Sequence, residues 1–343
     1  ESLEVVDLNP DVAAVAAAFS HENRDVIHHP RLRRVVNDGR NALLLSPDRY
    51  SVIISDATNP KTFDSWTLYT REFYELVRRR LEPGGVFCQW FVVPLPHDAV
   101  KVLLRTFREV FPHASLWCVY GSSQCMMLAT PQRLTIDHGT LARRLEPHWQ
   151  TSGLAEFGSG DVDKFLSFLL LGEDELGRAL LGVERLNTDD LPYAQFRVGG
   201  EVEGVRAFLD LLEHQASLEP YLVGAGETSR RRLEAYRSLA RRLHLGFLLN
   251  NQAEVEEAGA VAARAGLGDD ENVRSGLRYD SKRREYFEAV AITGEGVFPT
   301  LKKVSQMVLE SLNRQQASTA VRAPRRKDAQ DAKAKAKAPQ PVA

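Results

Sequence analysis

The alternation of short β-rich runs with helical patterns over residues 1–130 is the feature that most constrains the fold. Helical segments are recognised by apolar residues at i, i+3 and i+4. Alternating strands and helices are typical of an α/β fold, and here they predict a doubly wound, mainly parallel sheet. The predicted strands are Leu3–Asp7, Leu32–Asn37, Tyr50–Asp56, Gly85–Phe91, Ser115–Tyr120 and Cys125–Thr130. The predicted helices are Asp11–Phe19, Leu68–Leu81 and His97–Val110.

Two local patterns refine this expectation. The run Ser51–Ser55 is apolar without clean alternation, which predicts a strand covered on both faces. The stretch Glu82-Pro83-Gly84-Gly85 predicts the end of a helix and the turn into the next strand.

The chain changes character after the strand-rich part. Residues 131–200 are less regular, and residues 201–315 show helical patterns only. From Gln316 the chain consists mainly of Ala, Lys, Arg, Pro and Gln, a composition that cannot bury a core. We therefore expect a domain over 1–200, a helical module over 201–315 and a disordered basic tail over 316–343. The predicted helices of the module are Val202–Gln215, Ser229–Asn250, Gln252–Ala265, Ser281–Thr293 and Thr300–Arg314.

The composition is that of an ordinary globular protein, with 43% hydrophobic and 26% charged residues in 343. The formal net charge of −2 gives no argument for a nucleic-acid partner, and we expect none. Three cysteines, Cys88, Cys118 and Cys125, form no CxxC pair. We expect three buried, unpaired thiols in a reducing compartment, and therefore a cytoplasmic protein.

Carboxylates follow three of the predicted strands. Asp7 ends the first run, Asp38 with Gly39 follows the second, and Asp56 ends the third. At the carboxyl ends of strands in a nucleotide-binding sheet, such groups can accept hydrogen bonds from ribose hydroxyls or an adenine amino group. A helix cap or a plain turn is the alternative for Asp7 and Asp38. Burial at its strand end would make Asp56 a usable base, and a structural role is its alternative.

A fourth segment, Asn187–Pro192, places two adjacent carboxylates beside a proline. Such a pair can line a cleft, or it can cap a loop.

The order of these segments resembles the spermidine/spermine synthase family of polyamine aminopropyltransferases. The likeness is greatest to a bacterial branch that is fused behind transporter-like membrane segments. It rests on Leu68–Trp90 (LYTREFYELVRRRLEPGGVFCQW), on the stretch from Arg105 to His113 and on Asn187–Pro192. It covers about residues 1–200 and extends much less specifically to the helical part.

The resemblance implies a Rossmann-like transferase of polyamine biosynthesis. Its expected reaction moves an aminopropyl group from decarboxylated S-adenosylmethionine to a diamine such as putrescine, without a metal. By resemblance, Asp7 would hold the ribose of the cofactor, and Asp38 with Gly39 would recognise the adenine. Asp56 would accept the proton of the amine.

Two further residues are assigned to the amine side by the same resemblance. Tyr69 would lie near the amine-binding cleft. Asn59 stands where the family usually has a second carboxylate that helps to hold the diamine. We also expect a homodimer, and a parent protein tethered to a membrane on its cytoplasmic side.

The family's GGGxGG loop, which follows its first strand, has no counterpart in this chain. We therefore expect an N-terminally truncated domain whose sheet lacks the first strand, and weak binding of S-adenosyl compounds. Two alternatives remain open. An S-adenosylmethionine-dependent methyltransferase shares the sheet, although the run LYTREFY after Asp56 favours aminopropyl transfer. A catalytically inactive scaffold or regulatory module of a transporter fusion is favoured by Asn59 and the missing loop.

Overall fold

A computed structural model describes residues 2–21, 23–56, 59–62, 65–92, 95–118, 124–149, 161–197, 201–249 and 251–267. By its internal contacts the chain divides into residues 1–279 and 280–343, and all described residues lie in the first unit. The helices expected at Ser281–Thr293 and Thr300–Arg314 lie outside the described residues, as does the tail from Gln316.

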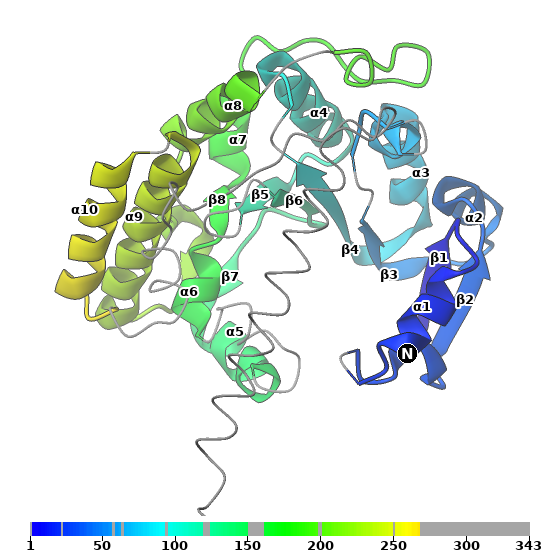
Figure 1. Cartoon of the computed structure of the whole chain (residues 1–343), viewed down its shortest axis with the longest axis horizontal. Helices are drawn as coiled ribbons and strands as arrows, with labels where there is room; N and C mark the ends of the chain where they lie inside the picture. The colour runs from blue at the N-terminus through cyan, green and yellow to red at the C-terminus, as the bar shows by residue number, and fades with distance from the viewer. Residues whose placement is uncertain are drawn as a thin grey trace, which may run out of the picture. The chain divides into compact units, whose positions relative to one another are not determined.

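The strands and helices predicted for residues 1–130 appear in their predicted order (Figure 1). The helix at Gly39–Leu45 and the short elements between residues 136 and 179 were not predicted. The strands are β1 (Leu3–Asp7), β2 (Leu32–Val36), β3 (Tyr50–Ser55), β4 (Leu81–Val92), β5 (Ala114–Cys118), β6 (Gln124–Ala129), β7 (Ile136–Asp137), β8 (Leu169–Leu171) and β9 (Leu222–Val223). The α-helices are α1 (Val12–Ala18), α2 (Gly39–Leu45), α3 (Arg71–Arg80), α4 (His97–Val110), α5 (His138–Leu145), α6 (Val162–Leu166), α7 (Glu173–Ala179), α8 (Glu201–Glu213), α9 (Glu227–Leu249) and α10 (Gln252–Arg264). Short 3₁₀ turns occupy Val26–His28, Trp66–Tyr69, Glu146–His148 and Glu219–Tyr221.

The strands form an α/β structure, as predicted, but in separate sheets. Strand β1 pairs in parallel with β2, and a five-stranded sheet has the order β3-β4-β6-β5-β8. Only β3 and β4 are parallel in that larger sheet. The expectation of a mainly parallel sheet is therefore wrong there, because β5 and β6 pair as an antiparallel hairpin. In the described part of the chain, β1 and β3 each have a strand partner on one side only.

Strand β3 differs from its prediction in burial. The side chains of Val52 and Ile54 are 55% and 71% exposed, whereas Ile53 packs against the main core. Successive side chains of a strand point to opposite faces, and only the Ile53 face is covered by described residues. The expectation that this strand is covered on both faces is therefore wrong.

Strand β4 begins earlier than the predicted Gly85. Gly84 has φ of 87°, a backbone conformation that glycine adopts without a steric penalty. The pairing with β3 shifts register between Tyr50 and Val52, so regular pairing starts at Val86. The predicted turn is thus present, but it lies inside the strand as an irregularity.

Apolar side chains cover both faces of the five-stranded sheet at β5, whereas one face of β3 at its edge is exposed. On one face, α3 and α4 pack on β4 through a group of contacting aromatic rings. On the other face, Trp117 of β5 joins a second core with α6 and α9. Because Leu116 belongs to the first core and Trp117 to the second, the two cores lie on opposite faces. The rings of the first group are those of Phe73, Tyr74, Phe87, Phe107 and Phe111.

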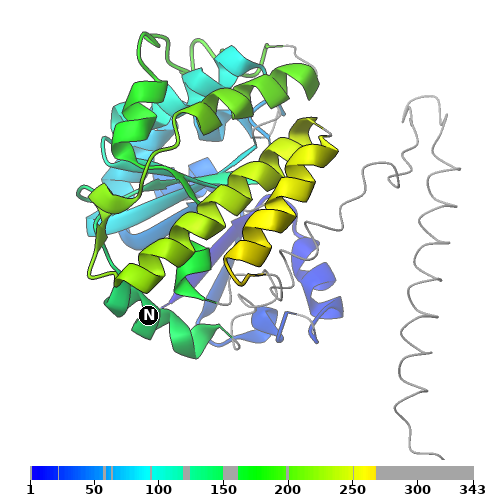
Figure 2. The ribbon, with the colours of Figure 1, turned by 90° about the vertical axis from the view of Figure 1, so that its left-hand side faces the viewer.

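The three helices predicted between residues 202 and 265 are confirmed as α8, α9 and α10. Helices α9 and α10 lie side by side in both views (Figures 1 and 2). An added Cβ at Gly246 of α9 would lie 2.7 Å from a methyl group of Val255, so the glycine permits this close approach. In the described residues, no helix has the length and apolar content needed to cross a membrane.

Two of the three cysteines correct the sequence prediction. Cys118 and Cys125 form a disulfide, with Cα atoms 4.3 Å apart, whereas Cys88 is free and half-buried. The two partners stand opposite each other on the antiparallel strands β5 and β6. Antiparallel pairs of the non-hydrogen-bonded kind bring Cα atoms within about 4.5 Å. The expectation of three unpaired thiols is wrong because it considered spacing without strand register.

Helix α9 contains a buried histidine that predicts a pH dependence of stability. The side chain of His244 is 3% exposed, and its ring centroid lies 4.9 Å from that of Phe208. Burial lowers the pKa of His244 to about 4. Because this lies below the ordinary value of about 6.5, protonation favours the unfolded chain. The stabilisation is complete above pH 6.5 and is lost as the pH falls toward 4.

We expect the free energy of unfolding to fall by about 2 kcal/mol between pH 7 and pH 5 because of His244. Urea unfolding at the two pH values measures it. The His244→Phe variant should lose most of this slope, and the exposed control His21→Gln should retain it. An unchanged slope in His244→Phe would show that other groups cause the pH dependence.

Candidate functional site

Three carboxylates predicted from the sequence stand at strand ends. Asp7 is the last residue of β1, Asp38 lies two residues after β2, and Asp56 directly follows β3. Asp7 is in register with Val36, and the backbone N–H of Asn37 donates to the carbonyl of Asp7 over 3.1 Å. Asp7 and the Asp38 turn therefore share one edge of the parallel β1–β2 pair, where open α/β sheets bind ligands.

Asp7 and Asp38 also have local structural contacts. The Asp7 Oδ1 atom accepts from the backbone N–H of Asn9 over 2.8 Å. The Asp38 Oδ1 atom accepts from the backbone N–H of Asn41 over 2.8 Å and so caps helix α2. Within the described part of the chain, the second oxygen of each carboxylate has no hydrogen-bond partner. Each group can thus hold its turn and accept further hydrogen bonds at its second oxygen, which has two lone pairs.

The space next to Gly39 is open in the part of the chain that the structure describes. A Cβ added at this residue would meet nothing within 4 Å among the described residues. Gly39 is exposed and begins α2, directly after Asp38. A planar ring could approach the backbone here next to the Asp38 carboxylate.

Asp56 is exposed, contrary to the expectation of burial at its strand end. Burial raises the pKa of the Cys88 thiol, and the negative charge of Asp56 adds to this rise. Asp56 therefore lies within electrostatic reach of β4. Its exposure follows from the uncovered face of β3, on which Val52 and Ile54 also lie.

Tyr69 is fully buried, with 0% of its side chain exposed. Its hydroxyl donates to the carbonyl of Trp90 over 3.0 Å. Burial raises the pKa of this hydroxyl, a hydrogen bond with Gln89 opposes the rise, and the charge of Asp56 adds to it. Tyr69 thus contacts the last residues of β4, and its hydroxyl lies near enough to Asp56 for the carboxylate charge to affect it.

Asn59 is half-buried and forms a local turn. Its Oδ1 atom accepts from the backbone N–H of Lys61 over 2.9 Å, and its carbonyl accepts from the Thr62 hydroxyl over 2.9 Å. The residues between Asp56 and Asn59 lie outside the described part. Among the described residues, the amide N–H groups of Asn59 have no acceptor.

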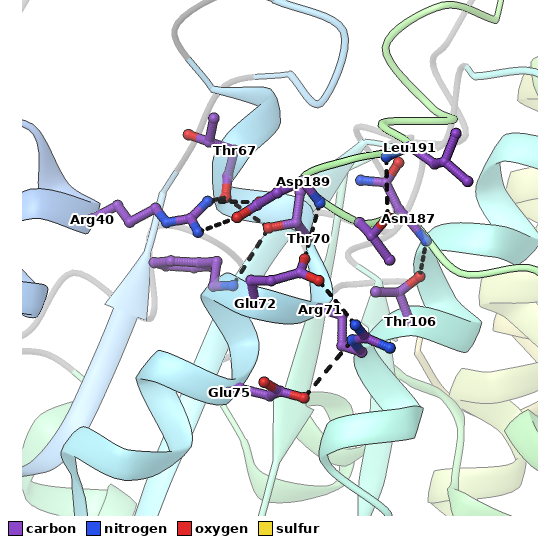
Figure 3. A network of polar contacts seen from close by, with 12 residues as sticks. Arg40, Thr67, Thr70, Arg71, Glu72, Glu75, Thr106, Asn187, Asp189 and Leu191 are labelled. Carbon is purple, nitrogen blue, oxygen red and sulfur yellow. Dashed lines mark hydrogen bonds and ion pairs between the residues drawn. The ribbon is translucent and has the colours of Figure 1, made fainter.

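The segment Asn187–Pro192 contacts the starts of helices α2 and α3, although it is far from them in sequence (Figure 3). Asn187 is buried, and its Nδ2 donates to the carbonyl of Tyr69 over 3.0 Å. Asp189 forms two hydrogen bonds with the guanidinium of Arg40. We singled out the carboxylates from the sequence but not Arg40, because no local pattern points to a partner 149 positions away.

A pocket of about 500 Å³ is lined by residues other than the strand-end carboxylates. Its lining is mostly apolar and includes Trp117, Met126, Leu141 and Phe165. Cys88 lines the pocket, and the charge of Asp56 helps to raise the pKa of its thiol. Apolar pockets are common ligand sites, but the charged groups predicted from the sequence do not line this one.

Comparison with known proteins finds a match to one family. Residues 1–123 match the model of the spermine/spermidine synthase domain. The polyamine aminopropyltransferase of Saccharolobus solfataricus is 31% identical over 126 residues, which are 36% of this chain and 42% of that protein. The enzyme of the same name from Nitrosomonas europaea is 29% identical over 136 residues, or 38% and 42% of the two chains. The chain thus spans less than half the length of these curated relatives.

Among solved structures, a spermidine synthase in complex with the transition-state analogue AdoDATO is 22% identical, with a TM-score of 0.34. The match covers 38% of this chain and 47% of that one. The three candidate carboxylates Asp7, Asp38 and Asp56 all lie within the part that matches the family. Over residues 1–123 of its 343, the chain is similar to the spermine/spermidine synthase domain.

Proposed function

We propose that this chain takes part in aminopropyl transfer from decarboxylated S-adenosylmethionine to a diamine such as putrescine. The observation that carries the proposal is the position of Asp7, Asp38 and Asp56, each at or just after a strand end, in the stretch that resembles aminopropyltransferases. Asp7 is assigned to the ribose hydroxyls, and Asp38 with Gly39 to the adenine. Their free carboxylate oxygens and the open space at Gly39 support this assignment.

Asp56 is assigned to the reacting amine. A diamine nitrogen with a pKa of about 10.4 must lose a proton before attack, which costs about 4–5 kcal/mol at pH 7. Asp56 would accept this proton, and the neutral nitrogen then attacks the carbon next to the sulfonium. A new C–N bond forms, the C–S bond breaks, and its electron pair leaves with methylthioadenosine. Tyr69 is proposed to shape the cleft from below, and Asn59 to contact the far end of the diamine.

Product analysis tests the proposal directly. The protein is incubated with putrescine and either decarboxylated or ordinary S-adenosylmethionine. Aminopropyl transfer yields methylthioadenosine and spermidine from the decarboxylated compound. S-adenosylhomocysteine from the ordinary compound would instead identify a methyltransferase, and the absence of product from both would favour a scaffold. The expected homodimer stays a prediction, which light scattering coupled to size-exclusion chromatography tests.

Replacing Asp7 by alanine is expected to weaken nucleoside binding about tenfold or more. A charge-assisted hydrogen bond contributes about 1.5–3 kcal/mol, and two ribose hydroxyls would be lost as donors. Calorimetric titration with methylthioadenosine measures the dissociation constant. The control is Asp11→Ala, a nearby exposed residue that makes no side-chain cap to α1. An unchanged dissociation constant in Asp7→Ala would remove Asp7 from the site.

A further inference from the structure

The first turn of α2 is held by an ion pair that the proposed function does not use. Arg40 is the second residue of α2 and directly follows Asp38 and Gly39. Its Nη1 and Nη2 atoms donate to the two carboxylate oxygens of Asp189 over 2.8 and 2.5 Å. Nη1 also donates to the carbonyl of Thr67 over 3.1 Å. Two parallel hydrogen bonds between planar groups fix orientation as well as distance.

Asp189 is itself fixed to helix α3. Its backbone N–H donates to Glu72 Oε2 over 3.0 Å (Figure 3). The hydrogen bonds from Arg40 hold the pKa of the Asp189 carboxyl below its ordinary value, although burial opposes this shift. The carboxylate is therefore charged near neutral pH and available to Arg40.

The segment that carries Asp189 is anchored two residues earlier. The backbone N–H of Asn187 donates to the Thr106 hydroxyl over 2.8 Å, and its carbonyl accepts from the N–H of Arg71 over 2.9 Å. These contacts join the segment to the start of α3 and to the middle of α4. Both helices contribute side chains to the main core. The position of Asp189 relative to the main core is therefore fixed, and Asp189 can hold the first turn of α2 through Arg40.

Helix α2 packs on the main core through one partly buried side chain, that of Leu43. None of its residues is buried. At its opposite end, Arg80 of α3 donates to the carbonyls of Leu43 and Leu44 over 3.0 and 2.8 Å. Arginine contacts therefore fix both ends of the helix, and the Arg40 contact is the one beside Asp38 and Gly39.

We propose that Asp189 and Arg40 are positioning residues, which hold the Asp38–Gly39 turn in the orientation needed to receive an adenine ring. This inference rests on the proposed function, because it concerns the same nucleoside site. It assigns a role in that site to a residue outside the part of the chain that matches the family. Neither residue needs to touch the ligand.

The test compares Asp189→Asn with a matched control. The amide removes the charge and one acceptor while keeping the shape of the side chain. The control is Asp174→Asn, which breaks an equivalent pair in which Arg133 donates to both Asp174 oxygens over 2.8 and 2.5 Å. We expect Asp189→Asn to weaken methylthioadenosine binding about tenfold, by calorimetry, and Asp174→Asn to leave it unchanged.

Arg40→Lys provides a second variant, since it keeps the charge but loses the two-pronged contact. It should weaken binding by a similar factor, and the double variant with Asp189→Asn should be no weaker than either single variant. This non-additive result is the signature of residues that act as one unit. Additive losses, or full affinity in Asp189→Asn, would overturn the inference.

Hydrogen exchange of the amides over 38–45 separates this inference from the proposed function. Exchange in α2 should become faster in Asp189→Asn than in the parent protein, and it should be unchanged in Asp174→Asn. If the parent protein binds no methylthioadenosine, the proposed function fails, and faster exchange in α2 alone still supports positioning. Unchanged exchange in α2 would overturn the inference whatever the parent protein binds.

Discussion

Replacing Asp56 by asparagine is expected to reduce aminopropyl transfer by about 10²–10⁴-fold, the usual contribution of a positioned base. The amide cannot accept the proton that the amine must lose. Nucleoside affinity should stay within a few-fold of the parent protein, because Asp7 and Asp38 are assigned to the nucleoside. Steady-state release of methylthioadenosine gives the rate, and calorimetry gives the affinity.

Asp48→Asn is the matched control for this variant. Asp48 is an exposed carboxylate just before β3, at the strand end opposite to Asp56. Its replacement should leave the rate unchanged. A rate for Asp56→Asn within a few-fold of the parent protein would end its assignment as the base. A parallel loss of nucleoside affinity would instead assign Asp56 to the cofactor.

Replacing Asn187 by alanine is expected to lower the free energy of unfolding by about 2–5 kcal/mol. The side chain is buried, and its Nδ2 donates to the carbonyl of Tyr69. Its Oδ1 accepts from the backbone N–H of Ala194 over 3.1 Å. The variant leaves both backbone groups without their side-chain partner, and a buried unsatisfied group costs about 1–3 kcal/mol.

Urea unfolding measures this loss against Asn251→Ala. The side chain of Asn251 caps α10 by accepting from the backbone N–H of Ala253, at an exposed position. Removing such a cap costs about 1 kcal/mol. A loss of similar size in the two variants would show that the buried amide adds no more than an ordinary helix cap.

The sequence predicted local structure well because local structure depends on neighbouring residues. The strand Leu3–Asp7 and the helix His97–Val110 have the predicted bounds in the structure. Their hydrophobic patterns have the period of a strand or helix and end at polar or turn residues. The strand-end positions of Asp7 and Asp56 follow from the same reasoning.

Contacts between distant segments could not be predicted in this way. The disulfide depends on the register of β5 and β6, and the pair of Arg40 with Asp189 depends on how α2 and a later loop meet. The exposed face of β3 depends on what covers it rather than on the composition of the strand. Each of these features is decided by tertiary arrangement, which local periodicity does not encode.

The distribution of buried residues has a consequence for how the protein melts. The described residues before Leu43 include no buried residue, and none of them packs against the buried cores. Cooperative unfolding requires parts of a chain to share a core, so this part should melt at a lower temperature than the rest. Calorimetry would then record two transitions instead of one. A nucleoside held by Asp7 and Asp38 would raise the first transition and leave the second in place.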